Sequence, residues 1–124
     1  MNKRDLTSIE QNILERLLSK DFPGKDQLKN QINGCLASDT GDDDNYGSIY
    51  LFPDRKSVAH VERRVPVDGL AKDSDGIPIN ILLHVEDGFL HELEITKLNG
   101  APLKASINIS EIKVVLNQDQ ADSQ

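Results

Sequence analysis

The residue types in this 124-residue chain that could do chemistry are three histidines, one cysteine and a close pair of glutamates. The histidines, His60, His84 and His91, can hold a metal ion only if the fold brings them together. Glu92 and Glu94 stand two apart on a predicted strand, hence on one face, where paired carboxylates can support acid–base catalysis. Because exposed carboxylates on strands are usually solvated, we expect no catalytic residue at this position.

The segment from Asp73 to Gly76 has the paired aspartates before a glycine that occur in calcium-binding EF-hand loops. With Gly76 at the sixth loop position, Leu82 falls at the twelfth, where calcium needs a carboxylate. We therefore interpret the segment as a turn before a strand. The chain also lacks a glycine-rich phosphate loop, a Gly-x-Ser-x-Gly elbow and a Cys-x-x-Cys pair. We expect no metal ion, no other cofactor and no enzymatic activity.

Acidic residues outnumber basic ones by 21 to 14, which gives a net charge of -7. Such a chain repels nucleic acid and attracts basic proteins or cations, although the charge can also serve only solubility. The strongest surface signal is an acidic loop with a tyrosine, because it combines negative charge with aromatic area. We predict that this loop binds a partner through Asp42, Asp43, Asp44 and Tyr46. The alternative is a solvated loop that contacts nothing.

A helix is predicted to begin at Thr7, because Thr7 and Glu10 have the spacing of a capping box, in which both side chains bind free backbone amides. Apolar residues then recur at helical spacing and form one stripe, made of Ile9, Ile13, Leu14, Leu17 and Leu18. A second, short helix is predicted from Lys25 to Ile32, since Asn33-Gly34 supplies a left-handed exit.

From Cys35 onward the hydrophobic period changes to two, as in an antiparallel sheet. The predicted strands cover residues 35–38, 48–52, 57–66, 77–85, 89–97 and 112–116. Cys35 is expected to be a buried thiol, and Arg63-Arg64 to pair with carboxylates. The predicted fold class is α+β, with the N-terminal helix and the short second helix packed on an antiparallel sheet of about five or six strands. We expect one domain at residues 1–116 and a disordered tail at 117–124.

The hairpin around Glu86-Asp87-Gly88 decides which residues share a face of the sheet. A two-residue turn would pair Val85 with Leu90 and put carboxylates beside core residues, with Leu83 and Ile81 opposite Glu92 and Glu94. A three-residue loop gives instead the pairs Val85–Phe89, Leu83–His91, Ile81–Leu93 and Ile79–Ile95. We prefer the three-residue loop, because it makes one face continuously apolar. It also sends His84 and His91 to opposite faces, so that they cannot chelate together.

The segment from Asp75 to Leu103 carries a set of residues that resembles a family of small bacterial proteins of unassigned activity. The matching residues are Leu82-Leu83-His84-Val85, Gly88, Leu90, Glu92-Leu93-Glu94, Lys97 and Gly100-Ala101-Pro102-Leu103. The resemblance extends more loosely over most of the chain, including the helical start at Leu6 to Leu18. It implies no catalytic residues, and the proteins it points to include candidate immunity partners of contact-dependent growth inhibition toxins.

These observations favour a cytoplasmic immunity protein that covers the active site of a cognate toxin, which we expect to be a basic protein and a nuclease. No apolar run is long enough to cross a bilayer, so we expect no membrane as partner. Because the net charge is -7, we expect no nucleic acid as partner either. One alternative is a binding module for a small ligand on the open sheet face around Asn80, His84, Glu92 and Thr96. The other is an enzyme of unfamiliar type, which would need titratable groups gathered in a cleft.

Overall fold

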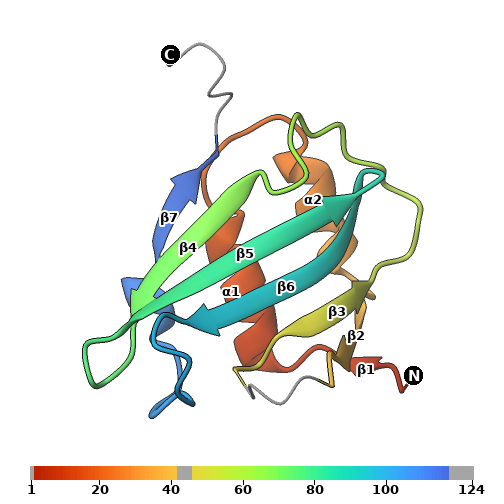
Figure 1. The fold of residues 1–124 in the computed structure, drawn as a ribbon. Coiled ribbons are helices and arrows are strands. Elements are labelled where there is room, and N and C mark those ends of the chain that lie inside the picture. Colours follow the sequence, from red (N-terminus) through yellow and green to blue (C-terminus); the bar gives the residue numbers. More distant parts are fainter. Residues whose placement is uncertain (1, 42–45, 118–124) are drawn as a thin grey trace.

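The structure is a computed structural model that describes residues 2–41 and 46–117. In this part of the chain, two helices and a seven-stranded antiparallel sheet form an α+β fold with the strand order β1-β2-β3-β6-β5-β4-β7 (Figure 1). In chain order the elements are β1 (Arg4–Asp5), α1 (Ser8–Leu17), α2 (Lys25–Ile32), β2 (Leu36–Asp39), β3 (Ile49–Phe52), β4 (Val67–Lys72), β5 (Pro78–Glu86), β6 (Phe89–Lys97), the short 3-10 helix η1 (Ile109–Glu111) and β7 (Lys113–Leu116). The fold class is the predicted one, with one strand more than expected.

Helix α1 begins as the sequence predicts. The Thr7 hydroxyl accepts a hydrogen bond from the Glu10 amide, and the Glu10 carboxylate accepts one from the Thr7 amide. Arg4 of β1 donates two hydrogen bonds to the same carboxylate, which ties the edge strand to the helix start. The predicted stripe is buried except at Ile9, which is 51% exposed and faces solvent.

Both helices lie on one side of the sheet, and the other side carries no helix in the described part of the chain (Figure 1). The core lies between the helices and the inner face of the sheet. Its fully buried side chains include Leu14, Leu17 and Leu28 from the helices and Ile79, Ile81, Leu83 and Leu93 from the two central strands. Helix α2 has the predicted bounds, from Lys25 to Ile32.

The predicted strand at residues 57–66 is wrong, because these residues form an irregular connection and the strand lies further on, at β4. Asp68-Gly69 is a dipeptide typical of turns, yet it stands inside β4. Packing explains the difference: a Cβ atom at Gly69 would come within 2.9 Å of side-chain carbons of Leu17 and Ile112. Glycine therefore allows α1 to lie close against the sheet.

The β5–β6 hairpin differs from both predicted registers. Its turn has two residues, Asp87 and Gly88, with φ angles of 54° and 83°, so the preferred three-residue loop is wrong. A β-bulge then shifts the register between His84 and Val85, so that Val85 pairs with Leu90 while His84 pairs with Glu92. The extra residue is His91. Beyond the bulge the inner-face pairs are Leu83–Leu93 and Ile81–Ile95, which keeps the carboxylates out of the core.

Cys35 is buried, as predicted, and is 4% exposed. Burial raises the pKa of its thiol to about 11. Because the thiolate is the reactive form, we expect Cys35 in the folded protein to react with Ellman's reagent at pH 8 roughly a hundredfold more slowly than in 6 M guanidinium chloride. Stopped-flow absorbance measures both rates, and equal rates would contradict the burial.

Candidate functional site

The predicted acidic loop is only partly described. Asp42, Asp43 and Asp44 lie outside the described residues, so the structure says nothing about them. Tyr46 is 6% exposed and belongs to the hydrophobic core. Its ring therefore does not provide the aromatic surface area that the sequence suggested, because it is buried in the core. The aspartates remain a prediction.

The uncovered face of the sheet is the largest candidate site. Its half-buried apolar and aromatic side chains come from three strands and include Tyr50, Leu82 and Val115. Four carboxylates share this face, namely Asp68, Glu86, Glu92 and Glu94. Among the cations near this face, Lys72 and Lys113 lie at the far end of β4 and at β7. Lys3 lies over the Phe52 ring of β3, and Arg64 pairs with Glu86 at the hairpin end. The centre of the face, over β5 and β6, is therefore negatively charged.

Two histidines contact these carboxylates. Nε2 of His84 lies 2.8 Å from Oε1 of Glu94, and Nε2 of His91 lies 3.6 Å from Oε2 of Glu86. The His91 ring also lies beside Tyr50, with 6.4 Å between ring centroids. Both histidines thus face the uncovered side, so the prediction of opposite faces is wrong, because the bulge adds one residue. Among the described residues, no group of three or more His, Cys, Asp or Glu side chains could hold a metal ion.

The residues of the predicted small-ligand site do share this face. Asn80 pairs with Thr96, and His84 pairs with Glu92, on neighbouring strands. Glu92 and Glu94 also lie on one face, as expected, but Glu94 makes an ion-pair contact with His84. The geometry offers these side chains for contact with a partner.

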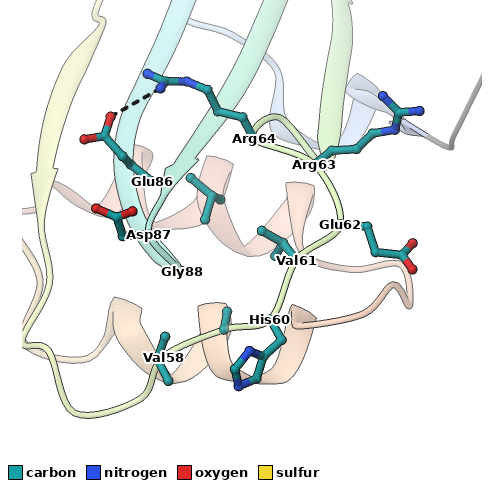
Figure 2. Close-up of a pocket in the computed structure, with 11 residues that line it drawn as sticks. Val58, His60, Val61, Glu62, Arg63, Arg64, Glu86, Asp87 and Gly88 are labelled. Carbon is teal, nitrogen blue, oxygen red and sulfur yellow. Dashed lines mark ion pairs between the residues drawn. The ribbon is translucent and has the colours of Figure 1, made fainter.

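A groove of about 840 Å³ lies beside the hairpin turn, between residues 58–64 and 85–88 (Figure 2). Its walls are held together by backbone hydrogen bonds, from the Ala59 amide to the Gly88 carbonyl and from the Val85 amide to the Arg64 carbonyl. Arg64 pairs with Glu86 across one end at 3.3 Å, in agreement with the expectation that this arginine meets a carboxylate.

Gln31 of α2 connects the two sides of the groove through the hydrogen bonds of its buried side chain. Its side chain is 1% exposed and donates hydrogen bonds to the carbonyls of Ser57 (2.6 Å) and Gly88 (2.9 Å). Its own carbonyl accepts a hydrogen bond from the Leu90 amide at 2.8 Å. One buried amide thus connects the helix, the long connection before β4 and the hairpin. The sequence pattern gave no signal for this role, because a lone glutamine on a short helix is usually exposed.

The segment from Asp73 to Gly76 forms the turn between β4 and β5, as predicted. Its aspartates bind a lysine instead of a cation from solution. The buried Lys97 ammonium donates to Asp73 (2.9 Å), to Asp75 (2.7 Å) and to the Pro102 carbonyl (3.3 Å). Hydrogen bonds from Lys97 and from the Lys104 amide hold the pKa of Asp73 well below its usual range. The hydrogen bond to Asp75 and, to a smaller extent, the hydrogen bond to Asp73 raise the pKa of Lys97.

Comparison with known proteins shows a match to a protein family. A family described as a domain of unknown function, DUF6984, matches residues 3–107. No curated protein and no solved structure matches the chain. The matched range contains both helices, β1 to β6, the groove and the ion pairs of Lys97 with Asp73 and Asp75. In the described part of the chain, no helix is long and apolar enough to cross a membrane.

Proposed function

This chain belongs to the DUF6984 family, and we propose that it is a non-catalytic binding protein that neutralises a basic toxin domain, as bacterial immunity proteins do. The observation that carries the proposal is the uncovered face of the sheet, which combines half-buried apolar groups with four carboxylates. The inner face is occupied by the helices, so the outer face remains for contact with a partner (Figure 1).

The charge of this face supports a basic partner. Asp68 of β4 and Glu92 and Glu94 of β6 flank β5 at its centre, in a chain whose net charge is -7. Such a field steers a positively charged protein into encounter and disfavours an anionic one. Tyr50 and Leu82 lie among these carboxylates and supply the apolar area that a stable contact buries.

The role as an immunity protein rests on this surface together with the resemblance around the hairpin. A toxin that acts on nucleic acid needs a basic active site, and an acidic protein that covers the site blocks access of the substrate. We place this action in the cytoplasm. The alternative, a small-ligand module around Asn80 and Thr96, has less support, because the groove lies instead at the hairpin end.

The double substitution Glu92→Gln with Glu94→Gln is expected to slow association with the proposed cognate toxin domain by roughly tenfold at low salt. The salt dependence of the association rate should weaken as well, because fewer charges steer the encounter. Stopped-flow fluorescence at several ionic strengths measures both quantities.

The matched control is Glu15→Gln with Asp26→Asn, which changes the charge equally on the exposed sides of α1 and α2. The control should leave the rate within about twofold of the unmodified chain. Equal slowing by the two pairs would reject the uncovered face as the binding site. A failure of the chain to protect cells that express this toxin domain would reject the immunity role itself.

A further inference from the structure

The groove beside the hairpin turn is a preformed site with walls of two kinds. Val61 and Val85 give it an apolar lining, and Asp87 and Glu86 of the hairpin lie along one side (Figure 2). The hydrogen bonds of Gln31 and Ala59 to the Gly88 carbonyl fix both sides relative to each other. A rigid hollow of this form costs little ordering entropy when a partner enters it.

The charged residues that line the groove are Glu62, Arg63, Arg64, Glu86 and Asp87, and Arg63 points away from the hairpin (Figure 2). The charges that remain on the hairpin side, Glu86 and Asp87 against Arg64, favour a cation. Asp87 makes no ion pair with any described residue, and its side chain points to the same side of the hairpin as that of Glu86 (Figure 2). Glu86 is paired with Arg64, but both side chains are exposed, by 47% and 60%, so the pair contributes little and a competing cation can replace Arg64 at low cost. Glu62, although it lines the same loop, points away from the hairpin (Figure 2).

We infer that this groove receives an arginine or lysine side chain from the basic partner, an inference that rests on the proposed function. The aliphatic part of that side chain lies against Val61 and Val85, and its charged end meets Asp87 and Glu86. Arg64 already holds the equivalent position toward Glu86 in the free protein, which shows that a long cationic side chain fits across this end. The groove thus adds a specific anchor to the contact made by the uncovered face.

The test is a titration of the full chain with N-acetyl-arginine N-methylamide, followed by amide chemical shifts in NMR. The amides of Val61, Val85 and Gly88 are expected to shift together, because they line the groove. Asp87→Asn should weaken this binding roughly threefold to fivefold, whereas Glu62→Gln should leave it unchanged. Asparagine tolerates the left-handed backbone at position 87, so the variant keeps the turn.

Equal weakening by Asp87→Asn and Glu62→Gln would overturn the inference, since it would show only a general effect of charge. Shifts confined to the uncovered face, around Glu92 and Glu94, would also overturn it while leaving the proposed function intact. Conversely, if arginine binds the groove and no basic toxin binds the chain, the proposed function fails and the groove remains a cation site.

Discussion

Replacing Lys97 with methionine is expected to lower the melting temperature by roughly 10 °C or more. The Lys97 ammonium and the Asp73 carboxylate have no exposed side-chain surface, and Asp75 is only 24% exposed. Removal of the lysine leaves two carboxylates without their counter-ion in a site that water reaches poorly. Differential scanning calorimetry measures the change.

The matched control is Lys104→Met. Lys104 contacts Asp73 only through its backbone amide, and its side chain is exposed, so this variant should melt within about 2 °C of the unmodified chain. If Lys97→Met melts as the control does, the buried pair does not stabilise the fold. Combining Lys97→Met with Asp73→Asn should recover part of the loss, because one unpaired charge is then removed.

The same contacts set the pH dependence of stability. Hydrogen bonds from Lys97 lower the pKa values of Asp73 and Asp75 in the folded state. Their contribution is therefore complete above the pKa of the unfolded chain, about 3.9, and is lost as the pH falls below it. Lys97 has a raised pKa, so its contribution is complete at neutral pH and is lost only as the pH rises through that value. The melting temperature of the Lys97→Met variant should therefore fall less steeply with decreasing pH than that of the unmodified chain.

Gly88→Ala is expected to reduce the free energy of unfolding by about 2–3 kcal/mol. Gly88 has a φ of +83°, and a Cβ atom there would lie 2.5 Å from the carbonyl oxygen of Ala59 and from a methyl carbon of Val58. The backbone of the connection must move away from the turn to make room. The hydrogen bond from the Ala59 amide to the Gly88 carbonyl would then be strained or lost. Urea unfolding followed by circular dichroism measures the loss.

Gly76→Ala separates the two causes. Gly76 has nearly the same φ, +82°, but no atom lies within 4 Å of a Cβ built there. This variant should therefore report the conformational cost alone, about 1 kcal/mol. Equal losses at Gly76 and Gly88 would mean that the close approach of the connection to the turn contributes nothing to stability.

Local patterns were sufficient for the helices and for one of the long strands. The capping box at Thr7, the bounds of α2 and the bounds of β6 depend on neighbouring residues in the sequence, and the structure has them as predicted. The wrong predictions concern contacts between distant segments. Residues 57–66 have strand composition, but their hydrogen bonds go to Gln31 and to the hairpin.

The hairpin shows the same limit in another form. Alternation of apolar residues predicted correctly that Ile81, Leu83, Leu93 and Ile95 share the inner face. The pattern could not reveal a bulge, because one extra residue at His91 preserves the alternation on both of its sides. In the sequence alone, a two-residue turn and an apolar inner face exclude each other. The structure combines the two-residue turn with an apolar inner face, because the bulge shifts the register.

For the candidate site, the sequence predicted the acidic character of the surface and the shared face of Glu92 and Glu94. It did not predict that Tyr46 is buried or that a groove forms beside Gly88, since both depend on the path of a connection with no regular structure. One available signal was Lys97, which follows Leu93 and Ile95 in the inner-face phase of β6. A lysine at a core position requires buried carboxylates nearby.

The strand order has a consequence for the synthesis of the chain. β7 pairs with β4, although residues 73–112 separate them, and Ile112, just before β7, is fully buried. Until Ile112 and β7 have left the ribosome, the hydrophobic core beneath α1 lacks the side chains that they contribute. Cotranslational acquisition of the native state must therefore wait for nearly all of the described residues to emerge, and such dependence on non-local pairing makes folding slow.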